Sequence, residues 1–124
     1  MKPPCNNWKK NIPDHIVMEI ETFISALDSK IQISKVILFG SWAKNTAHAW
    51  SDIDLAIISE DFVEEPDERI AHMLGIAMQS SCNRIQPLGY TQNEFSNGED
   101  QRFLGEIAHG LRIEWNTKSE DFNG

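Results

Sequence analysis

The stretch FGSWAKNTAHAWSDIDLAII, residues 39–58, is the part of the sequence that most clearly indicates the fold. It joins two short apolar runs, one ending at Phe39 and the other covering residues 53–59. Runs of this length, rich in β-branched residues, are typical of buried strands. Residues 41–50 between them are predicted to form a loop with one helical turn. The stretch therefore indicates two core strands whose ends carry polar residues: a Gly-Ser pair after the first, and an Asp-x-Asp pair at the start of the second.

Amphipathic helices are predicted on both sides of this stretch. Pro13 and Pro66 each stand in the first turn of a segment with apolar residues at helical spacing, a position that suits proline. The predicted inward face of the first helix consists of Ile16, Ile20, Phe23, Ile24 and Leu27. The predicted inward face of the second helix consists of Ile70, Met73, Leu74, Ala77 and Met78.

The last third of the chain predicts a strand, a helix and a short final strand. Pro87 in the predicted strand at residues 84–88 indicates either a sheet edge or a strand end. Ser96 and Glu99 have the spacing of a capping box that begins a helix, which ends near Gly110, and residues 111–115 follow as a strand. The fold class is therefore α/β (α+β), with a small mixed β-sheet and helices packed on it. One domain is expected over residues 1–124, with an N-terminal arm at 1–11 and a polar tail at 116–124.

Composition narrows the class of ligand. The formal net charge is −8, with 11 Lys and Arg against 19 Asp and Glu, so long nucleic acid is not the expected partner. A small phosphate ligand that arrives with a divalent metal remains compatible with this charge. No apolar run reaches the roughly 20 residues of a membrane span, and no signal peptide is visible, so we expect a cytoplasmic protein without a membrane partner.

The polar residues at the strand ends are the candidate site. Asp52 and Asp54 are two apart in a strand, so both side chains point to one face, with Cα atoms about 6–7 Å apart. Oxygen ligands of this kind suit Mg²⁺, which usually keeps phosphates and water as its other ligands. Gly40 allows a ligand to approach the backbone, Ser41 offers a hydroxyl and an N–H group, and Lys44 adds a cation.

Each of these signals has a plainer explanation when taken alone. An Asp-x-Asp pair occurs often on surface strands, and a Gly-Ser pair can simply end a strand and cap the next turn. The combination favours a metal–triphosphate site, because the Gly-Ser pair would hold the phosphates and the Asp-x-Asp pair would hold the metal ions that bridge them.

The spacing resembles a known family. Gly40-Ser41, ten residues and then Asp52-Ile53-Asp54, together with the preceding VILF run, is similar to the minimal nucleotidyltransferase family of the DNA polymerase β-like superfamily. The resemblance covers the chain from about residue 35 and implies a nucleotidyltransferase-like core. It implies Asp52 and Asp54 as catalytic, metal-binding residues. It implies Gly40, Ser41, Lys44 and Ser51 as nucleotide-binding residues.

The resemblance also implies ligands and partners. The cofactor would be Mg²⁺ (or Mn²⁺), and the substrate ATP or another NTP. Many small members are encoded beside a helical HEPN protein, and some act as antitoxins by adding AMP to it; others resemble the catalytic half of small-molecule nucleotidyltransferases. The small size of the chain favours an open face completed by such a partner or by a second copy of the chain.

The sequence departs from the family pattern at the third carboxylate, which is expected on a neighbouring strand. The equivalent residue here is Gln86, a neutral amide that cannot act as a general base. Two functions therefore stay open: an active transferase, whose base would come from Glu94, Glu99 or a partner, and a weakened member that binds a nucleotide or a partner. Lys44-Asn45 also replaces the usual Arg-Gly pair.

Overall fold

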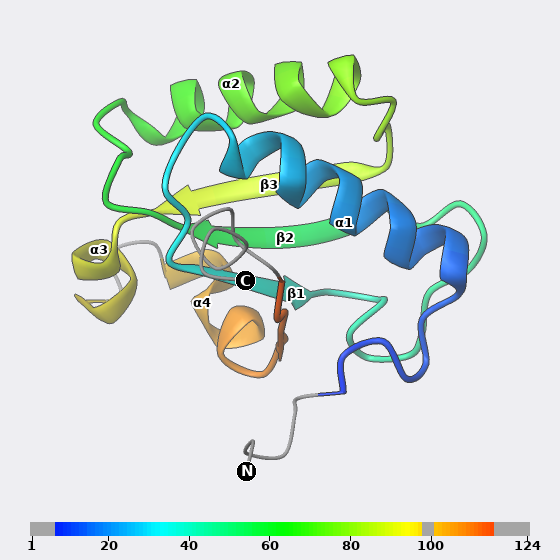
Figure 1. Ribbon diagram of the computed structural model, residues 1–124. Helices are drawn as coiled ribbons and strands as arrows, with labels where there is room; N and C mark the ends of the chain where they lie inside the picture. The colour runs from blue at the N-terminus through cyan, green and yellow to red at the C-terminus, as the bar shows by residue number, and fades with distance from the viewer. Residues whose placement is uncertain (1–6, 98–100, 116–124) are drawn as a thin grey trace, which may run out of the picture.

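The computed structural model describes residues 7–97 and 101–115. Its helices are α1 (Asp14–Asp28), α2 (Pro66–Gln79), α3 (Gln92–Asn97) and α4 (Gln101–Ala108), and its strands are β1 (Lys35–Phe39), β2 (Ile53–Ile58), β3 (Ile85–Tyr90) and β4 (Leu111–Arg112). The strands form one sheet in the order β3-β2-β1-β4 (Figure 1). β1 runs antiparallel to β2 and β4, whereas β2 and β3 are parallel. The predicted mixed sheet is confirmed, and β3 is an edge strand, which is one of the two possibilities that Pro87 indicated.

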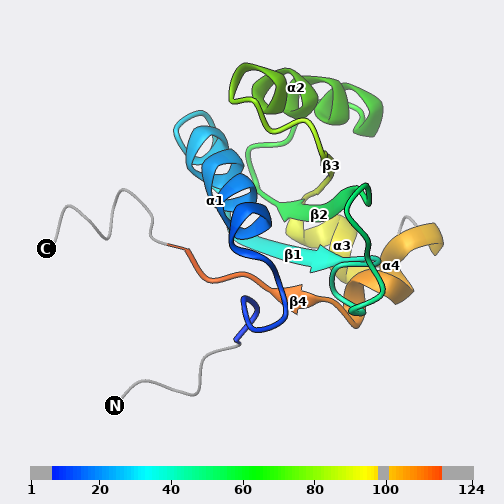
Figure 2. The same ribbon diagram turned by 90° about the vertical axis from the view of Figure 1, so that its right-hand side faces the viewer.

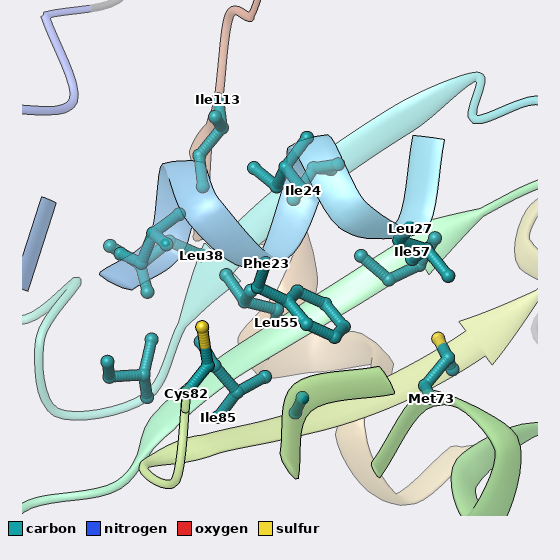
Figure 3. Packing of buried hydrophobic residues seen from close by; sticks show 14 of the residues in the cluster. Phe23, Ile24, Leu27, Leu38, Leu55, Ile57, Met73, Cys82, Ile85 and Ile113 are labelled. Carbon is teal, nitrogen blue, oxygen red and sulfur yellow. The ribbon is translucent and has the colours of Figure 1, made fainter. Parts of the chain in front are cut away.

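Helices cover both faces of the sheet. α1 and α2 lie on one face, and α4 lies on the other (Figure 2). On the first face, Phe23, Leu27 and Met73 of the two helices pack over Leu55 and Ile57 of β2 (Figure 3). The second, smaller cluster consists of Ile37, Phe39, Ala56, Ile58, Tyr90 and Ile107. Alternate residues of β2 therefore supply both cores, which explains why this strand is nearly continuously apolar.

The inward face of α2 differs from the predicted one. Arg69, Met73 and Ala77 are buried, at a spacing of four residues, whereas Met78 is 72% exposed. The prediction missed Arg69 because a charged residue is rarely buried unless it is paired. Here the guanidinium forms two hydrogen bonds with Glu94, at 2.6 and 3.0 Å, so the helix turns this side inward.

The predicted capping box at Ser96 and Glu99 is wrong. Ser96 lies inside α3, and Glu99 is outside the described residues. The box belongs to Thr91 and Glu94: the Glu94 N–H donates to the Thr91 hydroxyl at 3.2 Å, and the Thr91 N–H donates to the Glu94 carboxylate at 2.9 Å. The sequence analysis did not select this pair, although it has the same three-residue spacing as Ser96 and Glu99.

The ends of the chain pack differently from the prediction. Trp8 is only 3% exposed and joins the core under α1 with Ile12, so the described part of the predicted arm is packed against the fold. The predicted final strand is shorter, since β4 covers only Leu111–Arg112. The predicted tail at 116–124 lies outside the described residues. Within the described ranges, no helix has the length and apolar character needed to cross a bilayer.

Candidate functional site

The two halves of the motif meet at one end of the sheet. β1 and β2 pair antiparallel, so the end of one strand lies beside the start of the other, and Phe39 is opposite Asp54. Gly40 follows Phe39 directly and therefore adjoins the Asp-x-Asp pair. Asp54 shares its side of β2 with Ala56 and Ile58, which belong to the cluster under α4. The site thus opens on the α4 side of the sheet.

Gly40 has the geometry that the predicted close approach requires. Its φ angle is +76°, in the left-handed region that favours glycine. A Cβ atom at this position would overlap the Asp54 Oδ2 atom and lie 3.1 Å from Cγ. The carboxyl group of Asp54 therefore sits directly against the glycine Cα.

We expect Gly40→Ala to damage both stability and site geometry. The new methyl group must displace the Asp54 carboxyl, and an L-residue at this φ costs about 1–2 kcal/mol. Urea unfolding should show a loss of about 1–3 kcal/mol. Gly75→Ala is the matched control: a Cβ there meets nothing within 4 Å in α2, so it should leave stability unchanged or raise it by up to about 1 kcal/mol. Equal effects of the two changes would contradict this account of Gly40.

After Gly40 the chain makes one tight turn, as predicted. The Lys44 N–H donates to the Gly40 carbonyl at 3.1 Å, and the Thr46 N–H donates to the Ser41 carbonyl at 2.9 Å. Asn45 ends the turn with a φ of 61°, a conformation that Asn tolerates better than most residues. Ser41 and Lys44 therefore lie in the turn that begins at Gly40, the residue in contact with Asp54.

Ser51 takes part in fixing the loop before β2. Its hydroxyl accepts a hydrogen bond from the His48 N–H at 2.9 Å, and its N–H donates to the His48 carbonyl at 3.0 Å. Its carbonyl accepts from the Trp42 indole at 3.4 Å, which ties the two halves of the loop together. These contacts show that Ser51 stabilises the loop. Its nucleotide-binding role stays a prediction from the sequence.

The two aspartates differ in their surroundings. Asp52 is exposed, whereas Asp54 is half-buried beside Gly40. The pKa of Asp54 is raised to about 6, mainly by burial of the carboxyl group and also by the negative charges of Asp52 and Glu106. Concentrated negative charge of this kind is unfavourable without a cation, and such perturbed groups gather at functional sites.

Gln86 occupies the position that the sequence assigned to it. In the parallel pairing of β2 and β3 it is the register partner of Asp54, and its side chain is exposed. Parallel register partners lie on the same face of a sheet, so Gln86 stands beside the aspartates. The strand next to Asp54 therefore presents a neutral amide at this register, as predicted.

Glu106 on α4 is a site residue that the sequence analysis missed. One of its carboxylate oxygens lies 2.8 Å from the Lys44 ammonium nitrogen, and its charge reaches Asp54. No spacing in the sequence signals this contact, because Lys44 and Glu106 are 62 residues apart and meet only when α4 docks beside β1. Lys44 is thus part of an ion pair at the edge of the site.

Glu94 is not placed to serve as a base for this site. It follows the far end of β3 and is paired with the buried Arg69. The hydrogen bond from Arg69 holds the pKa of Glu94 below its usual value, so the group is a carboxylate with a structural partner. The other candidate, Glu99, lies outside the described residues.

The donor set suits a hard divalent cation that brings further ligands with it. Within residues 7–97 and 101–115, no three Asp, Glu, His or Cys side chains form a group that could hold a metal by themselves. Asp52 and Asp54 supply carboxylate oxygens, which Mg²⁺ or Mn²⁺ accepts together with phosphate oxygens and water. The mutual repulsion around Asp54 would be relieved by such a cation. The residues present therefore fit a metal that is shared with a phosphate ligand.

Comparison with known proteins agrees with this geometry. The nucleotidyltransferase domain family matches residues 17–115, which include both halves of the motif, so the chain belongs to the nucleotidyltransferase domain family. Among solved structures, it is similar to a chain in "Crystal structure of the toxin-antitoxin with AMP-PNP", with a TM-score of 0.51 and 21% identity over 82% of this chain and 77% of that one. At this identity the likeness supports the fold. No curated protein gives a significant sequence match.

Proposed function

We propose that this chain is a metal-dependent nucleotidyltransferase of the minimal type, which acts as a single cytoplasmic domain and transfers AMP from ATP. The observation that carries the proposal is the contact between the two halves of the motif, where Gly40 leaves room for the carboxyl group of Asp54. Phosphate and metal ligands then lie on one face. Asp52 and Asp54 would hold Mg²⁺ or Mn²⁺, and Gly40, Ser41, Lys44 and Ser51 would line the nucleotide side.

The reaction needs little covalent chemistry from the protein. The oxygen of an acceptor hydroxyl forms a bond to the α-phosphorus, the bond from that phosphorus to the bridging oxygen breaks, and pyrophosphate leaves. Asp52 and Asp54 would hold the metal, which when bound would supply positive charge to the phosphates. The chain's residues orient the nucleotide and the aspartates. The acceptor proton must go to a base or to solvent, and Gln86 cannot take it.

A protein acceptor is the proposed partner. The similar solved chain comes from a structure described as a toxin-antitoxin with AMP-PNP, which supports an antitoxin role and an adenine nucleotide for this chain. The partner would be a helical HEPN-type protein, and a second copy of the chain is the alternative. The exposed Asp52 and the site's position at the end of the sheet leave room for a macromolecular acceptor.

The test is direct mass measurement. Purified chain is incubated with ATP, Mg²⁺ and the protein encoded by the adjacent gene, and each protein is weighed intact by mass spectrometry. The proposal expects the partner to gain one or more AMP units. Nucleotide binding without any mass gain on protein or small-molecule acceptors would favour the alternative function, a weakened member that acts by binding.

The substitution Gln86→Asp tests how much the neutral amide at this position lowers the rate of nucleotide transfer. Because Gln86 is the register partner of Asp54, an aspartate there adds a carboxylate beside the metal-binding pair. General-base catalysis contributes about 10²–10⁴-fold, so we expect transfer to rise by at least about tenfold. Gln79→Asp, at the end of α2, is a control for the added charge. An unchanged rate in Gln86→Asp would mean that the base is supplied from elsewhere.

A further inference from the structure

The ion pair between Lys44 and Glu106 removes a positive charge from the site. Lys44 is the only Lys or Arg between residues 36 and 68, a range that includes the whole motif. It is also the cation closest in sequence to Gly40 and Ser41. In the structure its ammonium nitrogen lies 2.8 Å from a Glu106 carboxylate oxygen. The cation that would meet a phosphate is therefore already engaged by an anion of the same chain.

Tight packing of α4 against β1 places Glu106 at this point. The next residue, Ile107, is 1% exposed in the core between α4 and the sheet. Gly110 allows the close approach, since a Cβ there would lie 2.5 Å from the Leu38 carbonyl oxygen and 2.6 Å from the Ile37 side chain. The backbone that follows Glu106 is therefore held against β1, although the Glu106 side chain is exposed.

The pairing leaves the site with a surplus of negative charge. Asp52, Asp54 and Glu106 contribute three carboxylates, and Lys44 contributes one ammonium group. The guanidinium of Arg84 also contacts the motif loop, at the Ala49 carbonyl, and lies 4.0 Å from the Glu19 carboxylate, so carboxylates still outnumber cations here. A triphosphate without metal carries several negative charges and meets net repulsion on this face. A metal-bound triphosphate brings its own positive charge to the two aspartates, so it depends less on Lys44.

We propose that Glu106 is a specificity-determining residue that restricts this site to metal-bound nucleotide by pairing with Lys44. The inference rests on the proposed function. Without Glu106, Lys44 would be available to a free triphosphate, and one repelling charge would be lost. Two unit charges about 4 Å apart interact by about 1 kcal/mol in bulk water and by more near a protein surface, which corresponds to roughly a five- to tenfold change in affinity.

The experiment compares binding of a non-hydrolysable ATP analogue with and without metal. Titrations in EDTA and in Mg²⁺ give two dissociation constants, and their ratio measures the selectivity for metal-bound nucleotide. We expect Glu106→Gln to strengthen metal-free binding roughly five- to tenfold, and to change binding in Mg²⁺ by less than about twofold. Glu106→Asp keeps the charge and should keep most of the selectivity. In a Lys44→Met background, Glu106→Gln should have a clearly smaller effect.

Glu114→Gln is the matched control for the loss of one carboxylate. Glu114 is exposed and lies near the start of β1, at the other end of the sheet, because Ile113 bonds to Val36 there. The Glu114→Gln variant should have the same selectivity for metal-bound nucleotide as the wild type.

Two results would overturn the inference while the proposed function stands, provided that the wild type binds metal-bound nucleotide. One is an unchanged ratio of the two dissociation constants in Glu106→Gln. The other is an equal effect of Glu106→Gln with Lys44 present and in the Lys44→Met background. If the wild type binds no metal-bound nucleotide, the proposed function fails and the inference fails with it.

Discussion

Asp54→Asn is expected to lower nucleotide transfer by about a hundredfold or more, because in the proposed function Asp54 is a metal ligand that contributes several kcal/mol to stabilising the transition state. The amide has nearly the same shape as the carboxyl group, so the contact with Gly40 is preserved. Asp52→Asn should act in the same direction. The measurement is transfer of labelled AMP to the partner at saturating ATP and Mg²⁺. Undiminished transfer by both variants would refute the assignment of the aspartates.

The same substitution is expected to stabilise the protein in the absence of metal. The pKa of Asp54 is raised from 3.8 to about 6 in the folded state, so the folded chain binds this proton more tightly than the unfolded chain. Stability from Asp54 is therefore present below about pH 4 and is lost as the pH rises through about 6. Because the carboxyl is only half-buried, solvent screening leaves an effect of about 1 kcal/mol.

Urea unfolding at two pH values checks this linkage. In EDTA at pH 8, Asp54→Asn should be more stable than the wild type by about 1 kcal/mol, and near pH 3.5 the difference should vanish. Mg²⁺ with nucleotide should stabilise the wild type and not the variant. A variant that is less stable than the wild type at pH 8 would contradict the electrostatic account of the site.

Arg69→Met is expected to cause the largest loss of stability, about 3–5 kcal/mol. Arg69 is 5% exposed, and its guanidinium bonds to both oxygens of Glu94 and to the carbonyl oxygens of Glu64 and Gly89, at 2.6–3.1 Å. The guanidinium also lies over the ring of Phe62, 5.4 Å from its centroid. Removing it leaves the carboxylate of Glu94 and two carbonyl groups without their partner.

Lys9→Met provides a matched comparison for Arg69→Met. Lys9 forms an ion pair with Glu21 at 2.9 Å, and both side chains are about half exposed. Breaking an exposed pair of this kind costs about 0–1 kcal/mol. The double variant Arg69→Met/Glu94→Gln should recover part of the loss, because the unpaired charge is gone. Similar urea midpoints for Arg69→Met and Lys9→Met would show that burial of the Arg69 pair contributes little.

The sequence predicted the features that depend on local pattern. Apolar runs predicted β1 and β2, and helical spacing predicted α1. The Gly40-Ser41 and Asp-x-Asp pairs were expected to act together, and they lie side by side at the paired ends of β1 and β2. Gln86 was expected on a strand next to the aspartates, and it stands opposite Asp54 in β3. The contact between the two halves of the motif could be predicted because β1 and β2 are joined by a loop and have little freedom in how they pair.

The sequence could not predict contacts that depend on how distant elements dock. The sequence analysis did not select Arg69, because its partner Glu94 lies on a helix 25 residues later. It did not select Glu106, because the contact with Lys44 forms only when α4 packs on β1.

In the proposed function, Asp52, Asp54 and the Gly40-Ser41 turn form one site for a metal-bound nucleotide. Isothermal titration of a non-hydrolysable ATP analogue, in Mg²⁺ and in EDTA, tests it most directly on the wild type and the Asp52→Asn/Asp54→Asn double variant. We expect the wild type to bind at least about tenfold more tightly in Mg²⁺ than in EDTA, and the double variant to lose at least about tenfold of the affinity in Mg²⁺. Equal affinity of the two proteins in Mg²⁺ would contradict it.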